Sequence, residues 1–294
     1  MNWIAVLVGA HEFGGLAGGT LADARSAVAG DAPEWLAPGL AAEFTLEADT
    51  WQAAEAAIRS RLGGRAIDVA VLPPEGRRKR LLIADMDSTI IGCECIDELA
   101  DFAGVKAEVS AITERAMQGE LDFPSALRHR VALLKSLPLG ALQQAYDERV
   151  RLNPGARALV QTMNAAHAVT ALVSGGFTFF TSRVAEAAGF QTNRANTLQD
   201  DGTALTGNVG EPILGREAKL AALLELSAVR GILPAECIAI GDGANDLAMI
   251  EAAGLGIAYR AKPVVAAAAR ARIDHADLTA VLYFQGYRQA EIVA

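Results

Sequence analysis

Residues 80–89, RLLIADMDST, decide how this chain is expected to fold. The apolar run from Leu81 to Ala84 is typical of a buried strand, and it ends in the acidic pair Asp85 and Asp87. Residues two apart in an extended segment point the same way, so both carboxylates should leave the strand on one side. Two carboxylates this close repel each other, which favours a bound cation or a proton on one of them. The pair therefore predicts a divalent-cation site or a general acid, and the alternative is a solvated turn or helix N-cap.

Similar apolar runs recur along the chain, each followed by a polar or glycine-rich loop and then a helical stretch. They are AVTALVSGG, ECIAIGDG and LGIAY, with strands ending near residues 173, 240 and 259. This alternation predicts an α/β fold, a Rossmann-like parallel sheet with helices on both faces. Ligands of such sheets bind beyond the carboxyl ends of the strands, where these polar loops fall.

Two segments interrupt the alternation. Residues 95–152 have helical patterning throughout, which predicts an all-helical cap inserted after the first core strand. Such an insertion would overhang the carboxyl edge of the sheet and act as a lid. Residues 195–209 place Asp201-Gly202 between two alternating runs, a pattern typical of a β-hairpin.

The first 76 residues predict a separate small α+β module. Trp3–Val8 and Ile67–Leu72 read as strands, while Leu21–Val28 and Thr50–Leu62 have helical spacing. The segment PPEGRRKR then separates this module from a second domain over residues 77–294. We interpret its four basic residues, 77–80, as a solvated hinge in preference to a nucleic-acid or targeting patch.

Composition excludes several classes of protein. The 294 residues carry a formal net charge of −9, which disfavours nucleic-acid binding. Three cysteines suit a reducing compartment, and no basic residue precedes Arg25, which argues against a signal peptide. No window reaches the roughly 18 apolar residues that a membrane-spanning helix needs. The expected location is the cytoplasm.

Three further motifs fall at the same predicted edge. Ser174-Gly175-Gly176 offers backbone N–H groups and a hydroxyl to an anion, although a plain strand-to-helix turn explains it equally. Lys219 stands near the start of a helix, where the helix dipole disfavours a cation. GDGAND, residues 241–246, adds Asp242 and Asp246, and it lacks the third glycine of a dinucleotide fingerprint.

The order DMDST, SGG, a lone lysine and GDGAND resembles the haloacid-dehalogenase (HAD) superfamily of phosphohydrolases over about residues 80–294. Within it, the DMDST form, the helical insertion and the GDGAND loop are similar to the phosphoserine phosphatase family. The N-terminal module resembles a degenerate form of the ACT-like extension of longer members. Its role stays open between structural support or dimerisation, which makes a homodimer possible, and serine sensing.

The resemblance implies roles for the acidic residues. Asp85 would attack phosphorus to form an aspartyl-phosphate, and Asp87 would protonate the leaving oxygen and later activate water. Mg²⁺ would be held by the carboxylates of Asp85 and Asp242 and the main-chain carbonyl of Asp87, with Asp246 nearby as a further partner.

The resemblance also implies a set of substrate-binding residues. Those for the phosphoryl group are Ser174, Gly175 and Lys219; Asn245 would orient the substrate; Glu94 would bind an ammonium, Arg130 a carboxylate, and Met117 and Phe123 would shed water as the lid closes. By composition alone, Arg115, Arg128, Arg149 and Arg151 compete with Arg130, and Met117 and Phe123 are also explained as helical core.

The function implied is Mg²⁺-dependent hydrolysis of O-phospho-L-serine in L-serine biosynthesis. One alternative is a HAD phosphatase or phosphotransferase for another small phosphorylated metabolite, such as phosphohomoserine. A second is a serine-responsive regulatory protein that only binds, against which the intact set of Asp85, Asp87, Lys219 and Asp242 argues.

Overall fold

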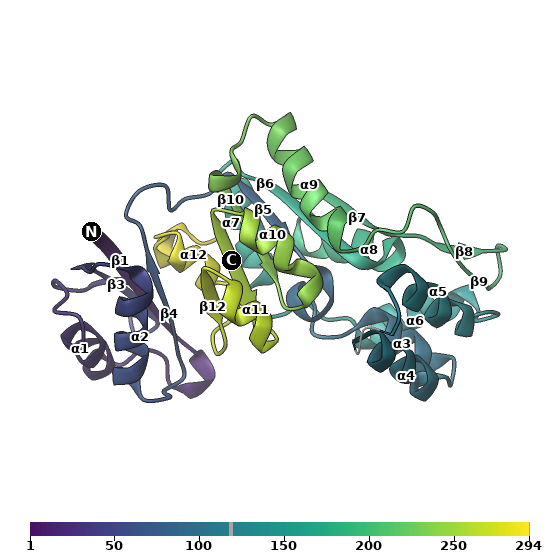
Figure 1. Cartoon of the computed structure of the whole chain (residues 1–294), viewed down its shortest axis with the longest axis horizontal. Helices are drawn as coiled ribbons and strands as arrows, with labels where there is room; N and C mark the ends of the chain where they lie inside the picture. Colours follow the sequence, from purple (N-terminus) through teal and green to yellow (C-terminus); the bar gives the residue numbers. More distant parts are fainter. Residues whose placement is uncertain (118–119, 294) are drawn as a thin grey trace.

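A six-stranded parallel sheet forms the centre of the molecule (Figure 1). The computed structural model describes residues 1–117 and 120–293, with Met117 described by its backbone alone. The strands run in the order β12-β11-β10-β5-β6-β7. Their bounds are β5 (Leu81–Ala84), β6 (Val169–Phe177), β7 (Thr192–Asn196), β10 (Cys237–Gly241), β11 (Leu255–Tyr259) and β12 (Ala271–Ile273). The predicted α/β sheet is therefore confirmed, and β7 and β12 are strands that the apolar pattern did not indicate.

Helices cover both faces of this sheet. Because successive strand residues point to opposite faces, Leu82 and Ala84 pack with the helices of one face, while Leu81 and Ile83 pack with those of the other. The first face carries α7 (Ala156–Ala165), α8 (Thr178–Ala188) and α12 (Ala280–Phe284). The second carries α9 (Arg216–Val229), α10 (Leu247–Ala252) and α11 (Pro263–Ala268). None of the helices in the described residues combines the length and the apolar character needed to cross a membrane.

The insertion after β5 is all-helical, as predicted. It consists of α3 (Cys95–Phe102), α4 (Lys106–Met117), α5 (Phe123–Leu133) and α6 (Leu139–Arg149). The predicted hairpin is also present, as β8 (Leu198–Asp200) and β9 (Leu205–Val209). The backbone N–H of Ser136 donates to the Leu205 carbonyl at 2.8 Å, so the hairpin is attached to these helices. Figure 1 shows the two side by side, on the far side of the sheet from the N-terminus.

The first 72 residues form the predicted α+β module. Its antiparallel sheet has the order β2-β3-β1-β4, and α1 (Gly18–Ser26) and α2 (Trp51–Leu62) pack against it. The strands are β1 (Asn2–Gly9), β2 (Glu34–Ala37), β3 (Ala41–Glu47) and β4 (Ile67–Leu72). The hydroxyl of Thr50 accepts the Ala53 N–H at 3.3 Å, which caps α2 where the sequence predicts its start. The domain division after residue 76 stays a prediction.

The module is fixed to the central sheet by buried polar contacts. Asp68 on β4 is fully buried and accepts the backbone N–H groups of Asp274 and Ala276 at 2.8 and 2.7 Å. Arg77, whose side chain is 10% exposed, pairs with Glu43 at 2.6 Å and donates to the Phe284 carbonyl. The interpretation of the basic run as a solvated hinge is therefore wrong for Arg77, which anchors the segment.

Candidate active site

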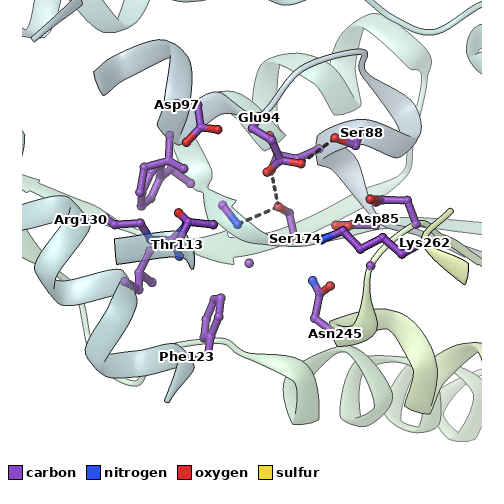
Figure 2. Close-up of a pocket in the computed structure, with 18 residues that line it drawn as sticks. Asp85, Ser88, Glu94, Asp97, Thr113, Phe123, Arg130, Ser174, Asn245 and Lys262 are labelled. Carbon is purple, nitrogen blue, oxygen red and sulfur yellow. Dashed lines mark hydrogen bonds between the residues drawn. The ribbon is translucent and has the colours of Figure 1, made fainter. Parts of the chain in front are cut away.

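The loops after β5, β6 and β10 meet at one edge of the sheet, facing the helical cap. A cavity of about 400 Å³ lies between them (Figure 2). Most of the residues predicted for the site line it, namely Asp85, Asp87, Glu94, Phe123, Arg130, Ser174, Gly175, Asp242 and Asn245. The parallel sheet brings these residues together because the carboxyl ends of neighbouring strands share an edge.

The loop after β5 turns sharply directly behind the two aspartates. Asp87 is extended (φ −66°, ψ 137°), and the next residue, Ser88, has a left-handed backbone with φ 55°. The Asp85 Oδ1 accepts the Met86 N–H at 2.8 Å, which fixes the carboxylate over its own loop. Among the described residues, no donor reaches the Asp85 Oδ2, so that oxygen keeps its lone pairs available.

Asp87 is held by two donors from different elements. Its Oδ1 accepts the backbone N–H of Cys95 at 2.9 Å, and its Oδ2 accepts the Ser174 hydroxyl at 3.1 Å. A Cβ on Gly176 would lie 2.8 Å from the Asp87 Oδ2, so a larger residue there would displace the carboxylate. The second glycine of the SGG motif is therefore explained by close approach to Asp87.

Lys219 lies behind the cavity surface, between two carboxylates. Its side chain is 2% exposed, and its Nζ lies 2.7 Å from the Asp85 Oδ1 and 2.6 Å from the Asp246 Oδ1. Burial alone would lower the pKa of Lys219, but the charges of Asp85 and Asp246 outweigh it and raise the pKa. Lys219 is therefore a permanent cation whose charge is shared by two acids.

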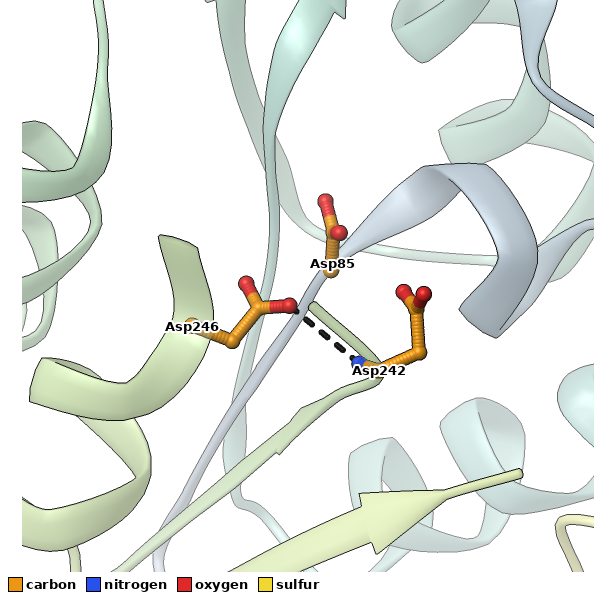
Figure 3. Close-up of side chains that lie close together, drawn as sticks. All are labelled: Asp85, Asp242 and Asp246. Carbon is orange, nitrogen blue, oxygen red and sulfur yellow. Dashed lines mark hydrogen bonds between the residues drawn. The ribbon is translucent and has the colours of Figure 1, made fainter. Parts of the chain in front are cut away.

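Three carboxylates form a cluster that fits a hard divalent cation. Asp85, Asp242 and Asp246 each offer an oxygen within 4.8 Å of the others (Figure 3). Asp246 already accepts Lys219 on Oδ1 and the Gly243 N–H on Oδ2, at 3.0 Å. Asp85 and Asp242 are consequently better placed to ligate directly, with Asp246 supporting them. An all-oxygen donor set of this kind suits Mg²⁺ or Ca²⁺.

Burial weakens the ionised form of these acids. It raises the pKa of Asp85 well above its usual range, and the charge of Asp246 raises it further, against the opposing effect of Lys219. Burial also raises the pKa of Asp87, with the Cys95 N–H bond opposing it. For Asp242, burial and Asp246 raise the pKa, whereas the Thr89 hydroxyl and the charges of Lys219 and Lys262 lower it. A divalent cation here would restore the ionised carboxylates.

The cap supplies the opposite wall of the cavity. Among the described residues, the hydrogen bonds of Arg130 on α5 are long ones, to the Ala126 carbonyl at 3.4 Å and the Thr113 hydroxyl at 3.5 Å, and its side chain lines the cavity (Figure 2). Glu94 accepts the Ser88 hydroxyl at 2.6 Å. The Phe123 ring lies over Gly175, where an added Cβ would meet it at 3.1 Å. The side chain of Met117, the other predicted lid residue, is not among those that the structure describes.

Replacing Glu94 with Gln should stabilise the metal-free protein at alkaline pH. Burial, with the charge of Asp87 second, raises the pKa of Glu94 from 4.5 to about 7. Between these values the folded state binds more protons than the unfolded state, so Glu94 makes unfolding easier as pH rises. Solvent at the cavity mouth screens part of the destabilisation caused by the ionised Glu94. We therefore expect Glu94→Gln to raise Tm by about 1–3 °C at pH 8.

Thermal unfolding at pH 5 and pH 8, with a chelator present, measures this effect. The gain should shrink toward pH 5, where the wild-type carboxyl is protonated. Glu108→Gln, at an exposed position on α4, is the control and should show no such pH dependence. An equal gain at both pH values would show that the charge of Glu94 is not the cause.

Sequence reasoning missed several residues that shape the site. The Thr89 hydroxyl donates to Asp242 at 3.1 Å, and the Asn196 amide donates to the carbonyls of Gly175 and Leu214. Further missed residues line the cavity, namely Ser88, Ile96, Asp97, Thr113, Leu127, Phe177, Gly243 and Lys262. Ser88 and Thr89 stand inside the DMDST motif, which was the available signal for them. No sequence pattern indicates Asn196, because β7 is short and polar.

Comparison with known proteins agrees with this geometry. Residues 82–251 match the haloacid dehalogenase-like hydrolase family. A phosphoserine phosphatase from Polaromonas sp. is 48% identical over 208 residues, which are 69% of this chain and 88% of that protein. The crystal structure of a probable phosphoserine phosphatase from Vibrio cholerae is 30% identical, with a TM-score of 0.78 over 99% of this chain and 88% of that one.

A third similar protein adds chemistry to the comparison. It is a phosphoserine phosphatase solved as an analogue of its phospho-aspartyl intermediate, 39% identical, with a TM-score of 0.65 over 70% of this chain and 99% of that one. Fold, motif order and these relatives agree. The chain therefore belongs to the phosphoserine phosphatase family of the haloacid dehalogenase-like hydrolases.

Proposed function

We propose that this chain hydrolyses O-phospho-L-serine to L-serine and phosphate through an aspartyl-phosphate on Asp85, as a step of L-serine biosynthesis. The observation that carries the proposal is the cavity's division into two ends. Nucleophile, acid and anion donors lie at the sheet, while an arginine and two further carboxylates, Glu94 and Asp97, lie at the cap. A substrate with a phosphate at one end and an amino acid at the other matches this arrangement.

Asp85 is proposed as the nucleophile. Its Oδ1 is held by the Met86 N–H and Lys219, so Oδ2 is the oxygen that attacks phosphorus. The new bond between Oδ2 and phosphorus forms as the bond from phosphorus to the serine oxygen breaks. The Ser174 hydroxyl and the Gly175 N–H are proposed to donate to the phosphoryl oxygens, which bear the transferred charge.

Asp87 is proposed as the general acid and base. Its raised pKa favours the protonated carboxyl that must deliver a proton to the departing serine oxygen. Once ionised, the same carboxylate takes a proton from a water molecule. The resulting hydroxide attacks phosphorus, the bond to Asp85 breaks, and phosphate leaves with the Asp85 carboxylate restored. Hydrogen bonds from Cys95 and Ser174 keep Asp87 in one position for both steps.

The cofactor is proposed to be Mg²⁺. The carboxylates of Asp85 and Asp242 would hold it, together with the Asp87 carbonyl and with Asp246 in support, and the all-oxygen cluster supports this assignment. When bound, it would neutralise charge on the phosphoryl group. Lys219 keeps the Asp85 carboxylate in place, and the Thr89 hydroxyl does the same for Asp242.

The selectivity for phosphoserine is proposed to come from the cap. Arg130 would bind the substrate carboxylate as a planar fork, and Glu94 would bind the ammonium. Phe123 packs over the SGG loop and would exclude water beside the phosphate. Asn245 lines the cavity on the side of Asp85 and Lys262 and would orient the substrate (Figure 2). Met117 is proposed as a second apolar lid residue by family position alone.

The setting of the enzyme is part of the proposal. The free cysteines Cys93, Cys95 and Cys237 support a reducing compartment, and the cytoplasm is the one proposed. Nucleic acid is not expected as a partner at a net charge of −9.

A phosphate-release screen tests the proposed function. Its substrates are phosphoserine, phosphothreonine, phosphohomoserine, sugar phosphates and an aryl phosphate, each with Mg²⁺ and with a chelator. We expect the highest kcat/KM for phosphoserine and loss of activity with the chelator. Preference for phosphohomoserine or a sugar phosphate would refute the substrate, and undiminished turnover with the chelator would refute the cofactor.

Changing Arg130 to Ala should separate substrate recognition from chemistry. We expect kcat/KM for phosphoserine to fall by about 100-fold, because the substrate carboxylate loses a charge-assisted hydrogen bond in a partly buried site. An aryl phosphate has no such carboxylate, so its kcat/KM should change by less than about threefold. Arg128→Ala is the matched control, since Arg128 pairs with Glu211 on the exposed surface. Equal losses on both substrates would exclude carboxylate binding by Arg130.

A further inference from the structure

The cavity as a whole has an excess of negative charge among the described residues that line it. Among the described residues that line the cavity, five are acidic, namely Asp85, Asp87, Glu94, Asp97 and Asp242. The cations among these described lining residues are Arg130 and Lys262. A phosphate dianion must nevertheless approach Asp85, and the two charges of the proposed Mg²⁺ do not offset all five acids, so further positive charge that faces the cavity is needed there.

Lys219 cannot supply that charge by direct contact in this conformation. Its ammonium is engaged by Asp85 and Asp246 at 2.7 and 2.6 Å, and its side chain is 2% exposed. Two neighbouring carboxylates offset its charge before any substrate arrives. Arg130 lies at the cap end, where its neighbours are Thr113 and Ala126. Neither residue leaves a free cation beside the phosphoryl position.

Lys262 does. It follows β11 and immediately precedes α11, whose first residue is Pro263. Its backbone N–H donates to the Asp242 carbonyl at 3.1 Å, which fixes the start of its side chain beside the GDGAND loop. Figure 2 shows the side chain extending into the cavity on the side where Asp85 and Ser174 lie. Lys262 is exposed, and no salt bridge within 4.0 Å engages its ammonium among the described residues.

We propose that Lys262 is a further substrate-binding residue, whose ammonium binds the phosphoryl group at the open side of the site, opposite the buried Lys219. The assignment rests on the proposed phosphatase function and adds a residue to it. The exposed position of Lys262 suits the capture of an incoming dianion, since a mobile ammonium can meet the phosphate before the cap closes.

Titration calorimetry with inorganic phosphate tests the role of Lys262 without any need for turnover. We expect Lys262→Gln, in buffer with Mg²⁺, to weaken phosphate binding by about tenfold, the loss expected for one charge-assisted hydrogen bond. Lys262→Arg should restore most of the affinity. Added salt should weaken binding to the wild type more than to Lys262→Gln, because an exposed charge is screened.

The matched control is Arg260→Gln, which removes one positive charge from the same loop at an exposed residue outside the cavity lining. It should bind phosphate as the wild type does. Kinetics give a second readout: Lys262→Gln should raise KM about equally for phosphoserine and for an aryl phosphate, unlike Arg130→Ala. Unchanged phosphate affinity in Lys262→Gln, or an equal loss in Arg260→Gln, would overturn the proposal. A wild type that binds phosphate but does not hydrolyse phosphoserine would refute the substrate instead.

Discussion

Replacing Asp85 with Asn should reduce turnover of phosphoserine by more than about 10⁴-fold, the size of loss seen when a nucleophile is removed. The amide cannot form the bond to phosphorus, although its shape is nearly the same. The folded state should not suffer, because the substitution removes one of the buried carboxylates that repel each other around Lys219, which keeps Asp246 as a partner. We therefore expect an unchanged or higher Tm together with the loss of activity.

Rapid quenching in acid, followed by mass measurement of the intact chain, follows the covalent step. Wild-type protein should gain one phosphoryl group during turnover, and the Asp85→Asn protein should gain none. Asp87→Asn is the informative control: an aryl phosphate with a good leaving group needs little protonation, so its phosphoryl group should still reach Asp85. Its release should be slow, since no base activates water. Phosphorylation of Asp85→Asn would show that another residue is the nucleophile.

The sequence predicts the central fold well because its strands are buried on both faces. Four apolar runs mark β5, β6, β10 and β11, and each ends in a polar loop. The strands that were not predicted lack such an apolar run. β7 (TNRAN) lies at the edge of the sheet and is mostly polar, and β12 contains three residues. β3 was also not predicted, although its residues alternate, with Phe44 and Leu46 inward and Glu43 and Thr45 outward. The pattern that would have indicated this strand was therefore available.

The candidate site is predictable where chemistry and topology coincide. The acidic pair of DMDST and the GDGAND loop each follow a predicted strand, so a parallel sheet must bring them to one edge. Topology alone does not predict which cap residues face the site. The choice of Arg130 over Arg128 depends on which side of α5 faces the sheet, and the resemblance to a family supplied that choice. The structure gives a physical difference: Arg128 pairs outward with Glu211, whereas Arg130 lines the cavity.

The position of Lys219 could be predicted, but its partners could not. A lysine in the first turn of a helix opposes the helix dipole, which correctly marked it as unusual. Its contacts depend on how α9 packs against β6 and against the turn Ala244–Asp246, which brings in Asp246 from a loop 27 residues further on. Lys262 shows the opposite case, since nothing in AKP distinguishes it from a surface lysine. Only the folded cavity shows that Lys262 lines it and that no salt bridge engages its ammonium among the described residues.

Replacing Lys219 with Met should have the largest effect on stability. Met has nearly the same length but no charge, so Asp85 and Asp246 would face each other in a buried site without their shared partner. Breaking a buried ion pair from one side costs about 3–5 kcal/mol in free energy of unfolding, and a similar loss is expected here with a chelator present. Turnover should also be lost, because Asp85 would be held protonated by its neighbours.

Urea unfolding of the single and double variants isolates the cause of this loss. If repulsion between carboxylates is responsible, Asp246→Asn added to Lys219→Met should recover part of the stability that Lys219→Met alone loses. The coupling between them should then reach about 1–3 kcal/mol. Mg²⁺ should also stabilise Lys219→Met more than the wild type, since a cation at the cluster of Asp85, Asp242 and Asp246 would replace the missing charge. Additive losses, with no greater benefit from Mg²⁺, would mean that Lys219 stabilises the fold by packing and not through its charge.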